Sequence, residues 1–406
     1  MTPPDTQPDA RPDPGQGKGS PFEVLKVATA LGLTSFGGPI AHLGYFRREY
    51  VERRHWLDDT TYAELVAICQ SLPGPASSQL GIAIGTRRAG AVGGLAAWIG
   101  FTTPSAIAML AFAAVASSTD LSQAGWVHGL KVAAVAVVAL AVYQMAVRLT
   151  PDWRRRAMAL AAAAAALLVV TPLAQLAIIG AGALAGLMLL APAPMAGNAD
   201  EPSPVSRRIG TLALATFAVL LVLLPVLRVA DGHAAELVDS FYRDGALVFG
   251  GGHVVLPLLH ASVVDPGWVT NDQFLAGYGA AQAVPGPLFS FAAYLGAVET
   301  PAPNGVLGGT IALIAIYLPS FLLIFGVLPY WHTLRRSSAF GRALAGTNAV
   351  VVGILLAALY TPIWTSAIVG PIDVVIAAVA LAALATGRVP PIVVVVGCAL
   401  VGQLLA

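Results

Sequence analysis

Four breaks rich in glycine and proline interrupt apolar runs of this 406-residue chain. They lie at 36–39, 73–75, 249–252 and 285–287. Where an apolar helix resumes after such a break, its first turn presents unpaired N–H groups and about half a positive charge. Glycine permits close approach to the backbone, and proline in a first turn removes no N–H that the helix needs. The breaks therefore predict an anion-binding site made from main chain.

Polar side chains accompany the breaks at matching positions. Ser77, Ser78 and Gln79 follow the second break, whereas Gln70 and Gln282 each precede a Pro-Gly-Pro by three residues. The alternative is that these side chains only satisfy backbone atoms freed by the breaks. The substrate-binding candidates are Gly37, Gly38, Pro39, Gln70, Gly74, Pro75, Ser77, Ser78, Gln79, Arg243, Gly251, Gly252, His253, Gln282, Gly286, Pro287 and Ser290.

Charged and titratable residues near the breaks each have two interpretations. Arg243 precedes the third break, and an arginine on a membrane hairpin indicates function. Pairing with Asp239 or Asp244 is the alternative. His42 and His253 follow the glycine tips, where packing competes with ligand contact as an explanation.

The breaks recur in one order at a nearly constant spacing. Phe249 follows Phe36 by 213 residues. Ser320 follows Ser105, each directly after a proline, by 215 residues. Several such markers in the same order indicate an internal duplication rather than chance.

Composition places the chain in a membrane. Hydrophobic residues make up 57% and charged residues 11%, and no soluble domain of this size could bury so much apolar surface. Cys69 and Cys398 lie in apolar runs, so no disulfide framework, metal site or cofactor is indicated. Residues 1–21 are polar and proline-rich, which predicts a disordered cytoplasmic tail and not a signal peptide.

After this tail the chain divides into two halves, 22–193 and 207–406, joined by a polar linker at 194–206. The segments beside the breaks are shorter than the roughly 20 residues of a span. They form either short spans or re-entrant hairpins, and hairpins are favoured because broken helices at depth line cavities. Hairpins are predicted at 22–55, 58–88, 236–264 and 270–299. Spans are predicted at 90–117, 124–148, 156–193 (split at 171–172), 208–229, 305–330, 341–360, 366–386 and 389–405.

The charges near the segment ends fit one threading through the membrane. With the N-terminus inside, segment 208–229 adds a single crossing, so that the second half enters the membrane in the opposite orientation. This threading places most arginines on the cytoplasmic side. The arginine clusters at 47–54 and 87–88 would gather anions there, or only set topology beside lipid headgroups. The predicted fold class is an all-α polytopic membrane protein with two homologous halves in inverted orientation, an architecture of secondary transporters.

The motifs at 36–39, 72–75 and 284–287 resemble those of the chromate ion transporter family, and the resemblance covers about 22–405. It implies a two-domain, long-chain member that exports chromate from bacteria and confers chromate resistance. Sulfate is a similar tetrahedral dianion, so a carrier of sulfate or another oxyanion is the alternative.

Other classes of function fit the sequence less well. An intramembrane enzyme is disfavoured because neither Gly-x-Ser-x-Gly nor His-Glu-x-x-His occurs. A scaffold would not need duplicated helix breaks. We therefore expect a multi-pass transporter of the bacterial inner membrane that binds an oxyanion and no nucleic acid; a homodimer stays open.

Overall fold

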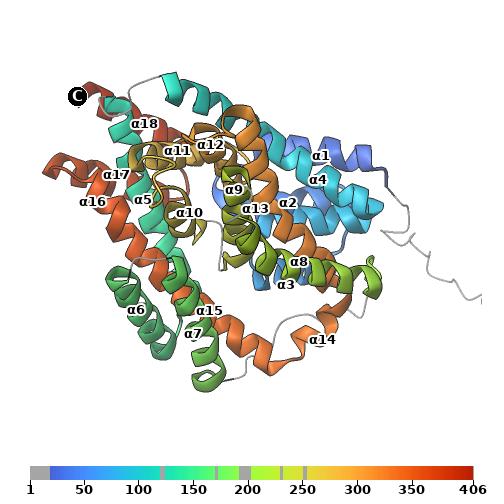
Figure 1. Cartoon of the computed structure of the whole chain (residues 1–406). Coiled ribbons are helices and arrows are strands. Elements are labelled where there is room, and N and C mark those ends of the chain that lie inside the picture. Colours follow the sequence, from blue (N-terminus) through green and yellow to red (C-terminus); the bar gives the residue numbers. More distant parts are fainter. Residues whose placement is uncertain are drawn as a thin grey trace, which may run out of the picture.

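The structure is a computed structural model that describes residues 19–118, 124–169, 172–191, 203–228, 232–249 and 254–405. All secondary structure in these residues is helical (Figure 1), which confirms the all-α class. Most of the predicted tail and linker lies outside the described residues. So do the site candidates Gly251, Gly252 and His253.

The helices of the first half end and begin at the predicted breaks. The helices at 21–34 and 59–71 start after side-chain caps: Ser20 accepts from the Glu23 amide, and Asp58 accepts from the Thr61 amide, which satisfies free N–H groups. The elements are α1 (Pro21–Thr34), α2 (Gly38–Phe46) with the π-helix η1 (Arg47–Arg53), α3 (Asp59–Ser71), α4 (Ala76–Ser118), α5 (Gly125–Leu149), α6 (Trp153–Leu168) and α7 (Pro172–Leu189).

The predicted second half begins with α8 (Arg207–Leu227). The remaining elements are α9 (His233–Leu247), α10 (Val255–Val263), α11 (Asn271–Ala283), the 3-10 helix η3 (Leu288–Ser290), α12 (Phe291–Val298), α13 (Gly305–Val327), the 3-10 helix η4 (Leu328–Tyr330), α14 (Trp331–Arg335), α15 (Ser338–Ala358), the π-helix η5 (Leu359–Trp364), α16 (Thr365–Ala367), α17 (Pro371–Ala385) and α18 (Pro391–Leu405).

Glycines in the left-handed region form the second and fourth breaks. Gly74 has a φ of +123° and Gly286 a φ of +104°, which residues with a Cβ rarely adopt. The prolines on either side fix φ and carry no N–H. The chain therefore leaves α3 and α11 abruptly and resumes as a new helix.

One helix of the first half corresponds to two helices of the second. α4 bends where Ala89 and Gly90 have non-helical dihedral angles, so it contains both the second helix of a predicted hairpin and the predicted span at 90–117. In the second half these pieces are α12 and α13, with residues 299–304 between them.

Glycine contacts at these bends are the same in both halves. A Cβ placed on Gly85 would lie 2.4 Å from the carbonyl oxygen of Gly93, and one on Gly296 would lie 2.5 Å from that of Gly308. Any side chain would separate the two helix segments, since interiors are closely packed. Gly85 with Gly93 and Gly296 with Gly308 thus make similar close contacts, while the duplication itself stays a prediction.

The two halves also exchange helices. α17 and α18 of the second half pack on α5 of the first, while α6 and α7 of the first half pack on α15 of the second (Figure 1). The predicted split near 171–172 is present as the separation of α6 from α7. Each half therefore contributes a helix pair to the other.

Long apolar helices indicate a membrane protein with several crossings. Among the described residues, five helices are long and apolar enough to span: 76–118, 125–149, 207–227, 305–335 and 338–367. On α8, Leu212 and Val222 are 68% and 72% exposed, as expected for side chains that face lipid.

Candidate functional site

The breaks of opposite halves meet in two equivalent crossings. The Gly74 amide donates to the Val248 carbonyl at 2.7 Å, and the Gly286 amide donates to the Ser35 carbonyl at 2.9 Å. Val248 lies directly before the third break, and Ser35 lies directly before the first. Each Pro-Gly-Pro break is therefore bonded to the first break of the other half.

A serine from the opposite half lies against each of these glycines. A Cβ on Gly74 would lie 2.8 Å from Ser320 Oγ, and a Cβ on Gly286 would lie 3.0 Å from Ser105 Oγ. Both serines are buried. Ser105 donates to the Thr102 carbonyl, whereas Ser320 Oγ has no partner among the described residues. In the sequence, Ser105 and Ser320 served only as markers of the repeat. Their equivalent positions, each directly after a proline, were the signal that could have identified them as site residues.

A small cavity lies at the crossing of the first and fourth breaks. Its volume is about 20 Å³, room for about one water. The structure thus brings together four of the predicted site residues and leaves too little space for an oxyanion in this conformation. The lining consists of Gly37, Gly38, Ala281, Gln282, Val284, Gly286, Leu288 and Pro391.

The buried polar groups after the second break have mixed roles. Gln79 Nε2 donates to the Pro73 carbonyl at 2.6 Å, while Gln79 Oε1 has no partner among the described residues. Ser78 Oγ lies 3.4 Å from Tyr317 Oη, and Ser290 Oγ donates to the Pro287 carbonyl at 2.8 Å. Gln79 and Ser290 thus donate to carbonyls of their own breaks. This is what the alternative predicts, in which these side chains satisfy backbone atoms freed by the breaks.

The two glutamines that precede Pro-Gly-Pro have different surroundings. Gln70 Oε1 accepts from Arg148 Nη2 at 2.6 Å. Gln282 lines the small cavity, and its buried Nε2 has no partner in the described part of the chain. A buried donor without an acceptor is uncommon, so Gln282 is the stronger ligand candidate.

His42 is buried beneath the first break. Its Nε2 lies 3.2 Å from the same Ser35 carbonyl that accepts from Gly286, and its ring packs edge-on against Phe101. Because that contact requires a proton on Nε2, the neutral ring leaves Nδ1 as an acceptor, and Nδ1 has no partner among the described residues.

Arg243 lies away from the cavity. It pairs with Asp239, which also lies 3.5 Å from Arg228. The structure therefore shows the pairing that the sequence left open as the alternative. Asp244, by contrast, accepts from Ser262 at 3.0 Å.

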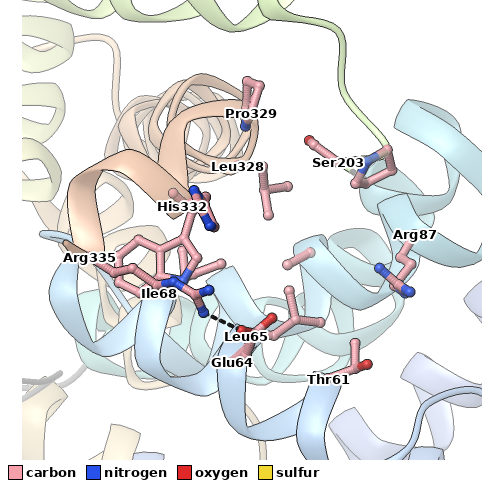
Figure 2. Close-up of a pocket in the computed structure, with 13 residues that line it drawn as sticks. Thr61, Glu64, Leu65, Ile68, Arg87, Ser203, Leu328, Pro329, His332 and Arg335 are labelled. Carbon is pink, nitrogen blue, oxygen red and sulfur yellow. Dashed lines mark hydrogen bonds and ion pairs between the residues drawn. The ribbon is translucent and has the colours of Figure 1, made fainter. Parts of the chain in front are cut away.

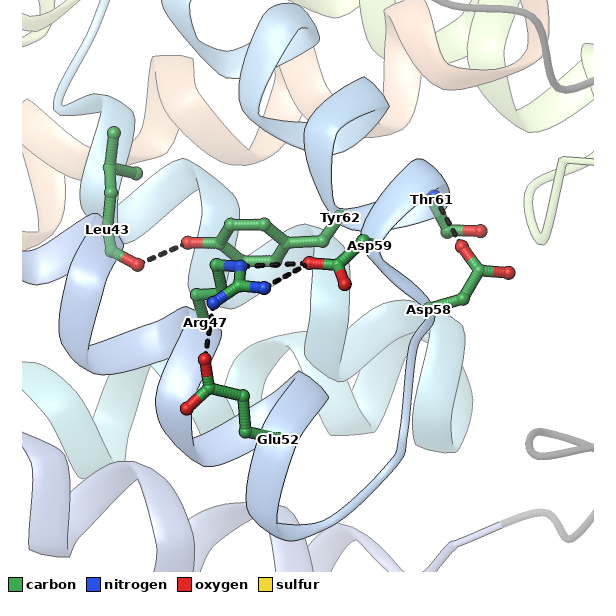
Figure 3. A network of polar contacts seen from close by, with 7 residues as sticks. All are labelled: Leu43, Arg47, Glu52, Asp58, Asp59, Thr61 and Tyr62. Atoms are coloured by element: carbon green, nitrogen blue, oxygen red, sulfur yellow. Dashed lines mark hydrogen bonds and ion pairs between the residues drawn. The ribbon is translucent and has the colours of Figure 1, made fainter.

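Carboxylates neutralise much of the arginine cluster at 47–54. Arg47 pairs with Glu52 and with Asp59 (Figure 3). Arg53 and Arg54 both pair with Glu49, at 2.9 and 2.7 Å. These contacts leave less positive charge for gathering anions, and the alternative, that the cluster sets topology beside lipid headgroups, stays a prediction.

The helices define a polytopic α-helical membrane protein, and the comparisons place it in a family. The family described as Chromate transporter matches residues 22–187 and 235–403. The chain therefore belongs to the chromate transporter family. No solved structure matches it.

Named relatives agree with this family. The chain is 26% identical to the probable chromate transport protein of Synechococcus elongatus, over 83% of each chain. It is 29% identical to the chromate transport protein of Pseudomonas aeruginosa, over 80% of this chain and 77% of that one. The uncharacterized transporter YwrB of Bacillus subtilis is 30% identical over 32% of this chain and 65% of its own length.

Proposed function

We propose that this protein is a secondary transporter that exports chromate across the bacterial inner membrane and thereby confers chromate resistance. The observation that carries this proposal is the pair of hydrogen bonds from Gly74 to Val248 and from Gly286 to Ser35. They join helix breaks of opposite halves at equivalent positions, as expected where two repeats enclose one substrate site. Family membership supplies the oxyanion as substrate.

Opening of a crossing would create the anion site. In the conformation described here, the N–H groups of Gly74 and Gly286 donate hydrogen bonds to carbonyls of the other half. We call this conformation the closed form. Separation of the halves at one crossing would release that N–H and enlarge the cavity. Four helix starts together would offer roughly two positive charges, which matches a dianion that must bind and also leave.

An inverted arrangement of the halves would explain the repeated contacts. α8 has no counterpart in the first half and adds one crossing between the repeats. With the N-terminus in the cytoplasm, α1–α2 and α3–α4 enter as hairpins from the cytoplasm and their counterparts enter from outside. Broken helices at depth are tolerated in such cavities.

Flux measurements in proteoliposomes test the function directly. Purified protein should move chromate, and competition by sulfate, molybdate and phosphate should rank the oxyanions. Stronger transport of sulfate than of chromate would favour the sulfate carrier. If no oxyanion moves under any gradient, the transport proposal fails.

A further inference from the structure

A second cavity lies between the two halves, at the face that the proposed topology places in the cytoplasm. Its volume is about 120 Å³, compared with about 20 Å³ at the breaks. Since one water needs about 10–15 Å³, it has room for the five heavy atoms of a tetrahedral oxyanion. Its walls come from α3 and α4 on one side, η4 and α14 on the other, and residues 203–204 before α8 (Figure 2).

An ion pair joins the halves inside this cavity. Arg335 Nη1 of α14 pairs with Glu64 Oε1 of α3 (Figure 2), and the two side chains are only 7% and 12% exposed. Arg87 of α4 and His332 of α14 also line the cavity. Among the described lining residues, Arg87 and Arg335 carry guanidinium groups and Glu64 carries a carboxylate.

Trp331 gives a second indication of a ligand. Trp331 lines the cavity and is 5% exposed, yet its indole Nε1 has no hydrogen-bond partner among the described residues. An indole N–H is a donor only, and a buried donor without an acceptor calls for a missing one. An oxyanion supplies acceptor oxygens, whereas a cation or an apolar ligand does not.

We propose that this cavity binds a tetrahedral oxyanion dianion, and that Glu64 is the internal competitor which the anion displaces from Arg335. The planar guanidinium forms paired hydrogen bonds with oxyanions as it does with carboxylates. The anion would bridge Arg87 and Arg335 and accept from Trp331. The choice of chromate as the physiological ligand rests on the proposed function.

Displacement of Glu64 would couple binding to separation of the halves. Glu64 and Arg335 belong to different halves, so their ion pair holds α3 against α14 in the closed form. An anion that occupies Arg335 removes this bond before it reaches the helix breaks. The cavity is therefore a first binding site on the route to the breaks.

The test measures sulfate affinity of the purified full-length protein at low ionic strength, where charge effects are least screened. Arg335→Gln should weaken binding at least about tenfold, the loss expected for a hydrogen bond to a charged group. Trp331→Phe should weaken it several-fold. Glu64→Gln should tighten it about tenfold, because a competing charge is removed. Arg336→Gln removes an equal charge from the exposed next residue and should change nothing.

The opposite effects of Arg335→Gln and Glu64→Gln on sulfate affinity distinguish an anion site from a purely structural ion pair. If the pair only holds the halves together, Glu64→Gln and Arg335→Gln will lower thermal stability alike and will not shift affinity in opposite directions, which overturns the proposal.

Chromate flux through the same variants in proteoliposomes separates the two proposals. Flux by the parent protein together with unaltered sulfate affinity in all variants would refute the cavity site and leave the transport function standing. Absence of flux together with the predicted order of affinities would refute transport and leave the site.

Discussion

The Gly286 amide donates a 2.9 Å hydrogen bond to the Ser35 carbonyl, and that oxygen also lies 3.2 Å from His42 Nε2. One carbonyl oxygen of the first half thus contacts a donor from the second half and the side chain beneath its own break. Separation of the halves would free the Gly286 N–H for an anion. We therefore expect binding and opening to be linked at this atom.

Gly38→Leu should abolish transport, because its side chain would fill the cavity at the first and fourth breaks. Gly38 lines that cavity and has a φ of +76°, so backbone strain of about 1–2 kcal/mol accompanies any side chain there. Gly90→Leu is a matched control: its φ is +68°, but no atom lies within 4 Å of an added Cβ.

Chromate flux and the yield of folded protein should be measured for both variants. We expect flux to fall at least about tenfold in Gly38→Leu, as for the loss of one hydrogen bond to a charged group, and to be nearly normal in Gly90→Leu. Equal losses in both would mean that strain alone explains the effect. Normal flux in Gly38→Leu would place the substrate elsewhere.

The bends that follow the two Pro-Gly-Pro hairpins should lie on opposite sides of the membrane. Ala91 and Ala302 are exposed residues at these bends, and in the proposed topology α8 adds one crossing between them. In a background without Cys69 and Cys398, Ala91→Cys should react with an impermeant thiol reagent from the cytoplasmic side only. Ala302→Cys should react from the outside only. Labelling of both from one side would end the inverted model.

Much of the fold could be predicted because its signals are local. A Pro-Gly-Pro sequence breaks a helix because proline carries no N–H and glycine permits positive φ, so the breaks at 73–75 and 285–287 were evident from the residue types alone. The spacing between Ser105 and Ser320 identified equivalent positions. What spacing cannot supply is which half each segment contacts. The bonds from Gly74 to Val248 and from Gly286 to Ser35 form because each Pro-Gly-Pro break packs against a break of the other half.

Side-chain roles were harder to predict for the same reason. Gln70 and Gln282 are equivalent in sequence, yet one binds Arg148 and the other lines a cavity, because different helices pack beside them. The pairing of Arg335 with Glu64 joins residues that are far apart in the chain. No local pattern indicates such a pair, whereas the pairing of Arg243 with Asp239 could be foreseen from their helical spacing.

Glu299 should make stability depend on pH. It lies in the connection after α12, its carboxylate oxygens accept no hydrogen bond within the described residues, and His233 Nε2 lies 3.3 Å away. Burial raises the pKa of Glu299 from 4.5 to about 8. Between these values the folded protein holds a proton that the unfolded chain has released, so stability falls as pH rises through this window and levels off above it.

Melting temperatures of the detergent-solubilised protein from pH 4 to pH 9 test this prediction. Glu299→Gln keeps a neutral side chain at every pH, so its melting temperature should fall less than that of the parent protein between about pH 4.5 and pH 8. His233 lies beside this carboxylate and also contacts Glu236; both residues are unchanged in the variant. Identical profiles for the two proteins would show that folding does not raise the pKa of Glu299.

Export should run on the membrane potential without obligatory proton exchange. Moving one charge across 100 mV is worth about 2.3 kcal/mol, so a dianion leaving a negative-inside cell gains roughly 4.6 kcal/mol. This could hold an outward gradient of about 10³. The cavity at the breaks is lined by neutral residues, so no carboxylate among its described lining residues carries a proton with the anion. The titratable side chain of His42 contacts the Ser35 carbonyl, which also accepts from the cavity residue Gly286.

Proteoliposomes with a potential set by potassium and no pH gradient provide the measurement. Chromate flux should reverse direction when the potential is reversed, and His42→Gln should keep this voltage dependence even if its maximal rate falls, since glutamine retains a donor for the Ser35 carbonyl. Glu299→Gln serves as the control for the buried carboxylate outside the cavity and should behave like the parent protein. Flux that ignores the potential and follows an imposed pH gradient would reject the voltage model and indicate electroneutral exchange, with His42 and Glu299 as the first groups to examine as proton carriers.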